Sequence, residues 1–533
     1  MKRMKKLASL LLALVLAMSM AMVVSAAPDT TTKHTITITN ETTDHVYEAY
    51  QVFKGDNSNE DDKLVDIDWG NGVNAAALLT ELKTLDAYKD CEDAEDVANV
   101  LKTFEDNSAQ IDAFAKVVAK HLATVAGTST ATASPYEISV TGDGYYFVKD
   151  RDSSVTAEGD TYTEYILKVV EDVEVAAKDG TVTSEKKVYD INDSTEIKPS
   201  VIPPEDWQDS ADYDIGDVIP FKLTATLPAN FTSYKTYQLT FHDEECDGLV
   251  FGGKDTVVVK INGNVITTGY EVVTTGFDHD CTFEVRFAEL VGMDGVTNNT
   301  VITVEYTSSL SGSNIVIGNP GNPNEMYVTF SNNPNNEQAG IPGEEPGKTP
   351  DDVVVVFTYE TIVDKVDEEG AALQGATFTL EKYDLATDAW NAVRQVETTP
   401  GTTFTFRGLD DGKYRLTETD TPPGYNSIEP IEFTVTATHT TEQVDGMEIL
   451  VETLTVSPED IFSAVVDLGK FEKEDGSEKD LTSGQIYTEV VNKAGTTLPE
   501  TGGMGTTLFY AIGAILVLGS AVVLITKKRM GEN

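Results

Sequence analysis

From about residue 180 onward, short strands in which apolar and polar residues alternate dominate the sequence. Before the Pro/Gly/Asn-rich stretch 332–351, which is typical of a linker, they include VIPFKLTATLP, YQLTFHD, TVVVKING and NTVITVEYTS. A second series follows the linker and includes ATFTLEKYD, TTFTFRGLD, GKYRLTETD and IEFTVTATH. Short alternating strands at this spacing predict two tandem β-sandwiches of the immunoglobulin type.

The segment before residue 180 has a different pattern. It opens with two candidate strands, HTITITN and VYEAYQVF, and strands return at YEISVTG, GYYFVKD and TEYILKVVEDVEV. Between them, residues 74–126 repeat apolar residues at helical spacing in NAAALLTELKTL and IDAFAKVVAKHLATVA. This segment therefore predicts an α+β domain, and the fold class of the whole chain is expected to be mainly β.

Both ends of the chain carry targeting signals. Basic residues at positions 2–6 precede an apolar run over 7–24, and Val24-Ser25-Ala26 offers small residues for cleavage before Ala27. A second membrane anchor is the alternative interpretation of this end. Near the C-terminus, an uncharged apolar run over 508–525 is long enough to cross a bilayer, and a basic tail follows it.

These patterns predict an exported chain with the following organisation: a cleaved signal peptide (1–26), an α+β N-terminal domain (27–179), a middle β-sandwich (180–348), a C-terminal β-sandwich (349–497) and a sorting segment with a transmembrane helix and basic tail (498–533).

The chain is strongly acidic, with a formal net charge of −51, so its surface repels nucleic acid and anionic lipid. A hydrophobic content of 40% with 21 Tyr and 20 Phe is nevertheless enough for folded cores, which excludes a disordered chain. Three cysteines do not make a disulfide scaffold. Cys246 and Cys281 fall in one predicted domain and could pair, which would leave Cys91 over.

We find no signature of an enzyme or a cofactor site. The six histidines show no metal spacing, and the sequence lacks HExxH, P-loop and GxSxG motifs. His242 and His279 lie among acidic residues and are expected to be solvated, and the DSSVT segment at 152–156 is expected to be a turn. We therefore predict no metal and no cofactor.

The pentapeptide Leu498-Pro499-Glu500-Thr501-Gly502 lies just before the C-terminal apolar run. Pentapeptide, apolar span and basic tail in this order resemble the cell-wall sorting signal of Gram-positive surface proteins. The resemblance implies that a sortase cysteine cuts between Thr501 and Gly502 and that the Thr501 carbonyl passes through a thioester to an amine. It implies a membrane-tethered precursor that is finally joined covalently to peptidoglycan.

Several further segments resemble, in order, the backbone (major) pilins of sortase-assembled Gram-positive pili. They are YEAYQVFKG and VEDVEVAAKDG in the first domain, EKKVYD and YVTFSNNP in the second, and LQGATFTL and RGLDDGKYRLTETDTPPGYN in the third, which resembles collagen-adhesin-B-type sandwiches. The resemblance implies a fimbrial subunit in a head-to-tail filament that serves adhesion. The implied partners are pilus and housekeeping sortases, other copies of the chain, peptidoglycan, tip and base pilins, and host or environmental ligands.

The pilin motif of that family ends in V-x-V-Y-P-K. Here Val173, Val175 and Lys178 match it, whereas Ala176 and Ala177 replace the Tyr-Pro pair. The resemblance implies that Lys178 is the amine that attacks the thioester formed at Thr501 of the next subunit. A solvated lysine at a strand end is the alternative.

Family members also form Lys–Asn isopeptide bonds within their sandwiches, helped by a buried carboxyl group. A lysine buried in an apolar core has a lowered pKa and becomes a neutral nucleophile, and a buried acid can polarise the amide. In the third domain the family's positions fall on Lys365, Asn492 and the acid Glu418. Lys365 shares strand parity with Val363, so it could face the core.

In the second domain the equivalent residues are less certain from sequence. Alternation favours Lys186 over Lys187 as the buried amine. Asn332 is preferred to Asn333 because it follows Val328 and Phe330 on one face of the predicted strand YVTFSNNP. The acid is expected to be Asp243, with Glu244 as the alternative.

Three other functions remain open at this stage. A monomeric wall-anchored adhesin would use the same stalk domains without a pilin lysine. A minor basal pilin would be attached to the wall without polymerising through itself. An exported enzyme is the third alternative, although no catalytic constellation is evident beyond the self-linking residues.

Overall fold

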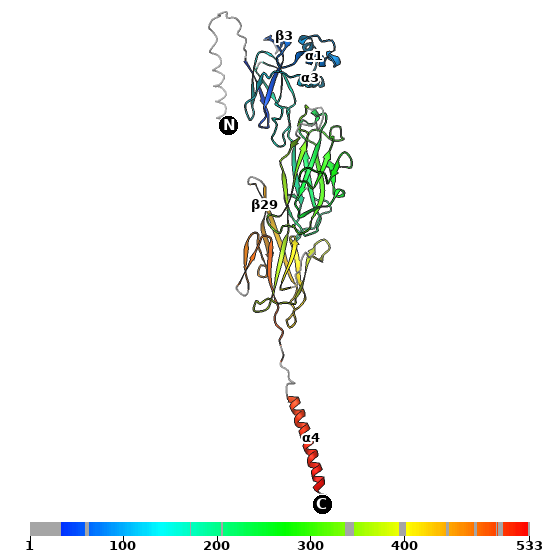
Figure 1. Ribbon diagram of the computed structural model, residues 1–533, viewed down its shortest axis with the longest axis vertical. Helices are drawn as coiled ribbons and strands as arrows, with labels where there is room; N and C mark the ends of the chain where they lie inside the picture. Colours follow the sequence, from blue (N-terminus) through cyan, green and yellow to red (C-terminus); the bar gives the residue numbers. More distant parts are fainter. Residues whose placement is uncertain are drawn as a thin grey trace, which may run out of the picture.

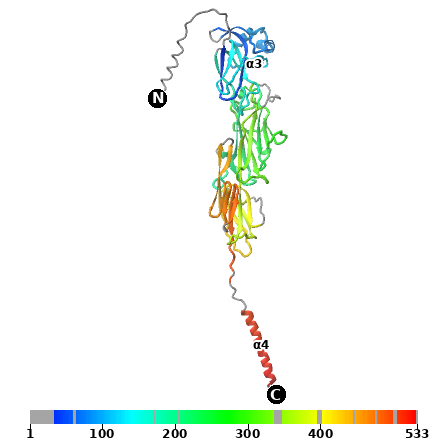
Figure 2. The same ribbon diagram turned by 60° about the vertical axis from the view of Figure 1, so that its left-hand side comes forward.

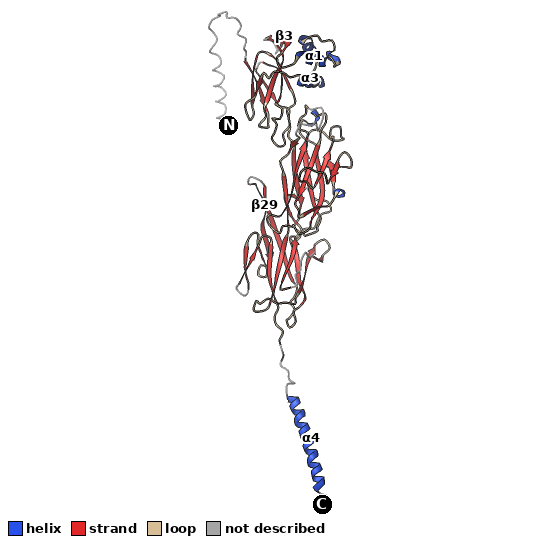
Figure 3. Cartoon of the chain, in the orientation of Figure 1, coloured by secondary structure: helices blue, strands red, loops and turns tan. Residues whose placement is uncertain are grey.

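The computed structural model describes residues 33–58, 63–170, 172–203, 206–335, 346–393, 401–443, 447–473, 477–496, 498 and 505–530. Three domains follow one another along the long axis and stay in one row when the molecule is turned (Figures 1 and 2). Strands fill the second and third domains, and the described α-helices lie in the first domain and at the C-terminal end (Figure 3). The predicted fold class is therefore confirmed.

The described residues of the first domain form the strands β1 Lys33–Thr39, β2 Tyr47–Asn57, β3 Leu64–Trp69, β4 Gly127–Thr128, β5 Tyr136–Thr141, β6 Gly144–Asp150, β7 Ile166–Val170 and β8 Val173–Ala176, which are arranged in two sheets. The three-stranded sheet has the order β5-β1-β8, and β8 runs parallel to β1. The other sheet has the order β3-β2-β6-β7, with β4 added to β2. Ile36 and Ile38 of β1 belong to the core that also includes residues of β2, β5 and β6.

The helical pattern over 74–126 forms α1 Ala75–Leu82, the 3-10 helix η1 Asp86–Tyr88, α2 Ala94–Leu101 and α3 Ala109–Lys120. Each α-helix begins after a polar cap, because a side-chain oxygen there accepts a hydrogen bond from an unpaired backbone N–H of the first turn. The caps are Asn74, Asp93 and Ser108. Apolar faces of the three helices share a core with β2, β3 and β6.

The second domain is a sandwich built from β9 Thr183–Tyr189, β10 Trp207–Gln208, β11 Ser210–Asp212, β12 Ile219–Thr226, β13 Leu239–Glu245, β14 Leu249–Phe251, β15 Val258–Ile261, β16 Asn264–Ile266, β17 Glu271–Val273, β18 Phe283–Phe287, β19 Val301–Leu310, β20 Asn322–Phe330, β21 Gly347–Lys348 and β22 Asp352–Phe357. It also has the 3-10 turns η3 Phe231–Ser233 and η4 Lys254–Thr256. One sheet has the order β10-β9-β12-β19-β15-β16, with β14 paired to β19; the other has β11-β22-β20-β13-β18-β17, with β21 paired to β20. The alternating residues of β12, β19 and β20 point into one shared core.

The third domain is built from β23 Tyr359–Val366, β24 Thr377–Asp384, β25 Ala389–Ala392, β26 Thr403–Leu409, β27 Gly412–Asp420, β28 Ile431–Gln443, β29 Met447–Ser457, β30 Ser463–Ala464, β31 Gly469–Glu472, β32 Glu478–Leu481 and β33 Gln485–Val491. Its main sheets have the orders β26-β23-β33-β30 and β25-β24-β27-β28-β29, and β31 pairs with β32. The first strand, β23, and the last, β33, are parallel neighbours. The two ends of this domain's chain therefore lie in one sheet.

The sequence places the boundary between the second and third domains after residue 348, whereas the strands of the second sandwich extend beyond that residue. Strand β22 pairs with β20 and β11, so it belongs to the second sandwich, and β23 begins the third one directly after it. The linker composition of 332–351 suggested an earlier end. The described part of that stretch instead includes β21, which continues the ladder of β20.

At the C-terminal end, α4 Gly505–Met530 contains an apolar stretch, Phe509–Lys528, that is long enough to span a membrane. Its length and composition agree with the predicted span over 508–525. The signal peptide and residues 499–502 of the sorting pentapeptide lie outside the described residues.

Candidate functional site

The middle of the second sandwich encloses a buried polar cluster. Lys186 extends from β9 in one sheet, and Asp243 (β13) and Asn324 (β20) face it from the other. The Lys186 Nζ lies 2.6 Å from Asp243 Oδ2 and 2.5 Å from Asn324 Oδ1. All three residues are at most 1% exposed. An amine, a carboxyl group and a carboxamide are therefore in contact across the two sheets.

Tyr306 of β19 completes this cluster. Its hydroxyl donates a hydrogen bond to Asp243 Oδ2 at 2.9 Å and accepts one from Asn324 Nδ2 at 2.8 Å. The acid and the amide are thus fixed relative to each other. Asp243 Oδ1 has no hydrogen-bond partner among the residues that the structure describes.

Burial changes the ionisation of the cluster. It lowers the pKa of the Lys186 amine below its ordinary value, against the opposing effect of Asp243. It also raises the pKa of the Asp243 carboxyl, against the effect of Lys186. Both shifts favour the uncharged forms, a free amine and a protonated acid.

The sequence predicted Asn332 for this position, but the structure places Asn324 beside Lys186 instead. Alternation identified the correct face of β20, since Asn324, Val328 and Phe330 all point inward. Asn332 lies past the end of this strand, and its backbone carbonyl accepts a hydrogen bond from the Tyr162 N–H of the first domain at 2.7 Å. Sequence periodicity gives the face of a strand but not the point at which it crosses the lysine.

The structure buries the two other residues that the sequence preferred for this cluster. Lys186 is buried, whereas Lys187 is partly exposed and pairs with Asp209 on the outer side. Asp243 faces the core, and Glu244 is exposed.

In the third domain, Lys365 lies near the end of β23 and Asn492 directly follows β33. Both are fully buried. The Lys365 Nζ donates hydrogen bonds to the carbonyls of Val366 at 2.9 Å and of Val490 at 2.8 Å. It therefore reaches β33, the strand that ends directly before Asn492. Burial lowers the pKa of Lys365 to about 8, although the nearby Glu418 opposes the shift.

Glu418 comes from β27 in the opposite sheet and contacts the asparagine. Asn492 Nδ2 donates to Glu418 Oε2 at 3.1 Å and to the Asn426 carbonyl at 2.6 Å. Thr421 also donates to Glu418 Oε2, at 2.9 Å. Glu418 Oε1 and Asn492 Oδ1 have no hydrogen-bond partner within the described part of the chain. The amide is therefore held by its nitrogen.

Lys178 lies two residues after β8, where the first domain meets the second. Its side chain is exposed, and the Nζ donates a hydrogen bond to Asn107 Oδ1 at 2.6 Å. Its backbone carbonyl accepts hydrogen bonds from the Glu164 N–H at 2.9 Å and from Asn230 Nδ2 of the second domain at 3.3 Å. The backbone is thus fixed while the amine remains accessible.

The sequence left open whether Cys246 and Cys281 pair, and the structure contains no bond between them. Both are free cysteines. The backbone N–H of Cys246 donates a hydrogen bond to the Pro323 carbonyl. Cys281 lies on the loop before β18, and its Sγ is 3.2 Å from the backbone carbonyl oxygen of Asp243. Placement in one domain did not bring the two thiols together.

Comparison with known proteins gives two matches to family descriptions. Residues 360–448 match SpaA, a prealbumin-like fold domain, and residues 490–530 match the LPXTG cell wall anchor motif. The predicted wall-anchor signal is therefore confirmed. Of its pentapeptide, only Leu498 lies among the described residues, and it is exposed.

The chain is 23% identical over 380 residues to the trypsin-resistant surface T6 protein of Streptococcus pyogenes serotype M6, an alignment that covers 59% of this chain and 65% of that protein. The solved T6 backbone pilin of the same serotype superposes with a TM-score of 0.53 at 17% identity, over 89% of this chain and 100% of that one. The full-length major pilin SpaD from Corynebacterium diphtheriae gives a TM-score of 0.49 at 15% identity, over 87% and 98%. The chain shares its fold with the T6 backbone pilin.

Proposed function

We propose that this chain is the backbone subunit of a surface pilus whose subunits are joined covalently, head to tail. The observation that carries the proposal is the presence, on one chain, of an anchor signal that supplies an acyl donor and an exposed lysine at a domain junction. One acyl donor near the C-terminus and one acceptor amine in the first domain join subunits head to tail. Contacts of this type that do not close into a ring produce a filament.

The joining reaction would use Thr501 and Lys178. A sortase cysteine attacks the Thr501 carbonyl, the Thr501–Gly502 peptide bond breaks, and the segment from Gly502 onward leaves. The neutral amine of Lys178 from another subunit then attacks the thioester, forms an amide with Thr501 and releases the sortase thiol. The exposure of Lys178 supports this role, since a large enzyme must reach the amine.

We further propose an isopeptide bond within each sandwich. In each, the neutral lysine amine attacks the asparagine Cγ, the Cγ–Nδ2 bond breaks, and ammonia leaves as the new Nζ–Cγ amide forms. The carboxyl group polarises the carboxamide and carries a proton from the amine to the leaving nitrogen. The residues are Lys365, Glu418 and Asn492 in the third domain, and Lys186, Asp243 and Asn324 in the second.

Polymerisation is tested in the native host. Wall extracts boiled in detergent and probed with an antibody to the chain are expected to give a high-mass ladder for the wild type and a monomer band for Lys178→Ala. Lys168→Ala is the matched control, because Lys168 is another exposed lysine of the same domain. It should keep the ladder.

Other outcomes would change the proposal in defined ways. A ladder that persists in Lys178→Ala moves the acceptor to another lysine and leaves the pilus intact. A monomer band in every strain, including the wild type, rejects the pilus and favours a wall-anchored monomer.

A further inference from the structure

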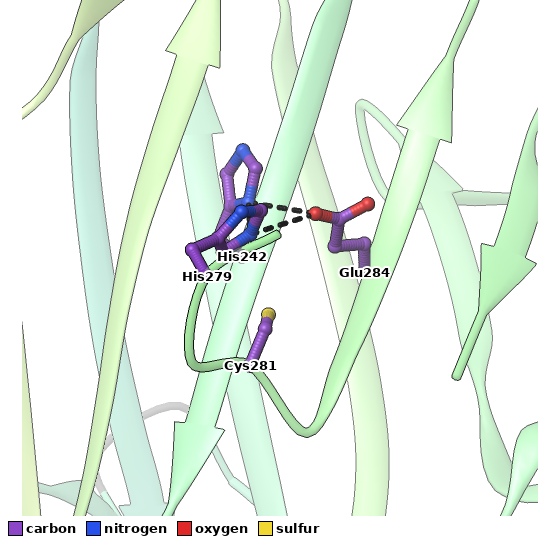
Figure 4. A group of neighbouring side chains, drawn as sticks. All are labelled: His242, His279, Cys281 and Glu284. Carbon is purple, nitrogen blue, oxygen red and sulfur yellow. Dashed lines mark hydrogen bonds and ion pairs between the residues drawn. The ribbon is translucent and has the colours of Figure 1, made fainter. Parts of the chain in front are cut away.

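Four potential metal ligands gather on the outer face of the second sandwich (Figure 4). His242 comes from β13 and Glu284 from the neighbouring strand β18, while His279 and Cys281 lie on the loop that precedes β18. One ligand atom from each residue lies within 4.8 Å of the other three. The sequence analysis predicted no metal, because the histidines show no metal spacing, and solvated histidines, because residues 242 and 279 lie among acidic residues.

The nitrogen and oxygen atoms of the cluster form a nearly equilateral triangle. His242 Nδ1 lies 3.3 Å from His279 Nε2 and 3.0 Å from Glu284 Oε1, and His279 Nε2 lies 3.1 Å from the same oxygen. Ligands about 2.0–2.1 Å from a tetrahedral Zn²⁺ are separated by about 3.3–3.5 Å. The three atoms therefore already lie close to three corners of a zinc tetrahedron.

Each of these three side chains is held by its other polar atom. His242 Nε2 pairs with Thr329 Oγ1 at 2.8 Å, and His279 Nδ1 pairs with Asp278 Oδ1 at 2.9 Å. Glu284 Oε2 pairs with Arg286 Nε. Contacts of this kind orient metal ligands in proteins, and here they direct the remaining ligand atom of each side chain toward the other two.

Burial also distinguishes the cluster from an ordinary group of surface charges. Glu284 is 1% exposed and His242 is 8% exposed, and the His242 ring stacks on Tyr327 at 4.5 Å between centroids. His279 is partly exposed, with 34% of its side chain accessible, so the cluster opens to solvent on one side. An ion could enter there without unfolding of the sheet.

We propose that His242, His279, Cys281 and Glu284 bind one Zn²⁺ ion. Two imidazoles, one thiolate and one carboxylate are a ligand set that suits Zn²⁺ in tetrahedral coordination. On binding, the Cys281 Sγ–H bond breaks, the thiolate takes the fourth position, and the proton passes to solvent. Four protein ligands leave no open position, so the site is structural: it fastens the loop before β18 to β13.

The test uses the mature full-length chain, purified in detergent, and titrates it with Co²⁺ in place of Zn²⁺. We expect one Co²⁺ per chain at this site, with tetrahedral d–d bands and a thiolate-to-cobalt charge-transfer band that added Zn²⁺ removes. Binding is expected to weaken as the pH falls, because protons compete for the ligands.

Two variants identify the ligands. Cys281→Ser should lose the charge-transfer band, and His279→Gln should weaken binding by about 10-fold or more. Cys246→Ser is the matched control, because it removes the other thiol of the same domain, which lies outside the cluster. Its band should be unchanged. His279→Gln alters a partly exposed loop residue and should not disturb folding. Its effect on cobalt binding can therefore be interpreted even if the cysteine variant fails to fold.

Two results would overturn the proposal. The first is the absence of a charge-transfer band in the wild-type chain at saturating Co²⁺. The second is a band that survives in Cys281→Ser but disappears in Cys246→Ser, which would assign the thiolate to another site. Protection of the 274–282 loop from proteolysis by Zn²⁺ provides an independent readout, and a loop cut equally fast with and without the ion would contradict the structural role.

Discussion

The identity of the asparagine in the second sandwich can be tested by replacing Asn324 with alanine. The Asn324 amide is in contact with Lys186 Nζ and with the Tyr306 hydroxyl. Its removal should abolish the proposed bond in this domain. The variant should therefore lose only one ammonia relative to the mass calculated from its sequence, through the bond of the third domain, whereas the wild-type chain loses two.

The expected loss of stability follows from the length of the closed loop. Lys186 and Asn324 are 138 residues apart. The chain-entropy relation derived for disulfides gives about 5 kcal/mol for a loop of this length. In a domain of this size that free energy corresponds to a fall in Tm of about 10–20 °C. The polar groups that lose their partner when the Asn324 carboxamide is removed would add about 1–3 kcal/mol to the destabilisation.

The assay combines intact mass spectrometry with calorimetry, and Asn332→Ala is the matched control. Asn332 contacts the first domain through its backbone carbonyl, which the substitution retains. Its mass should show the loss of two ammonias, as in the wild type. Asp243→Asn separates the bond from local packing, because it removes the acid at nearly constant shape. If Asn324→Ala loses as much ammonia as the wild-type chain, our assignment of the cross-link is refuted.

Three further changes test other parts of the structure. Glu418→Gln should prevent the third-domain bond, so the chain retains one ammonia by mass spectrometry, whereas Glu432→Gln in the same sheet should not. Tyr306→Phe should slow bond formation in the second domain after refolding, because the hydroxyl that positions Asp243 is lost; an unchanged rate would contradict that role. At the junction of the second and third domains, burial raises the pKa of Asp411 to about 8, against about 4 in an unfolded chain. The folded state then holds a proton that the unfolded state releases, so this contribution to stability is fully present below about pH 4 and lost as the pH rises to about 8. The Tm should fall over this window, and Asp411→Asn should reduce the slope; an equal slope in both chains would reject the assignment.

The predicted fold class is confirmed, and alternation indicated which lysine of β9 is buried, because alternation reports burial directly. Lys186 was preferred to Lys187 on this basis, and the structure buries Lys186. Alternation does not show which residue along a strand lies opposite a given residue of the other sheet. Asn324 and Asn332 have the same parity in the sequence alternation. Which of them meets Lys186 depends on where β20 ends and on pairings between distant strands, which local periodicity does not contain.

The zinc cluster could not be predicted for a similar reason. His242 lies opposite Glu284 only because β13 and β18 are paired, with these two residues in register. The loop then folds His279 and Cys281 over the same point. Short-range spacing identifies metal sites whose ligands lie on one turn or helix. Here strand pairing and a loop bring the ligands together, and the two histidines are 37 residues apart in the chain.

The parallel pairing of β23 with β33 has a consequence for a filament under tension. Force that enters the third domain at the start of β23 and leaves after β33 pulls the two strands past each other, so their hydrogen bonds are loaded in shear. With Lys365 bonded to Asn492, the load would pass from one strand to the other through a single amide. The chain between these residues would then carry no force, and the domain could not lengthen by unravelling.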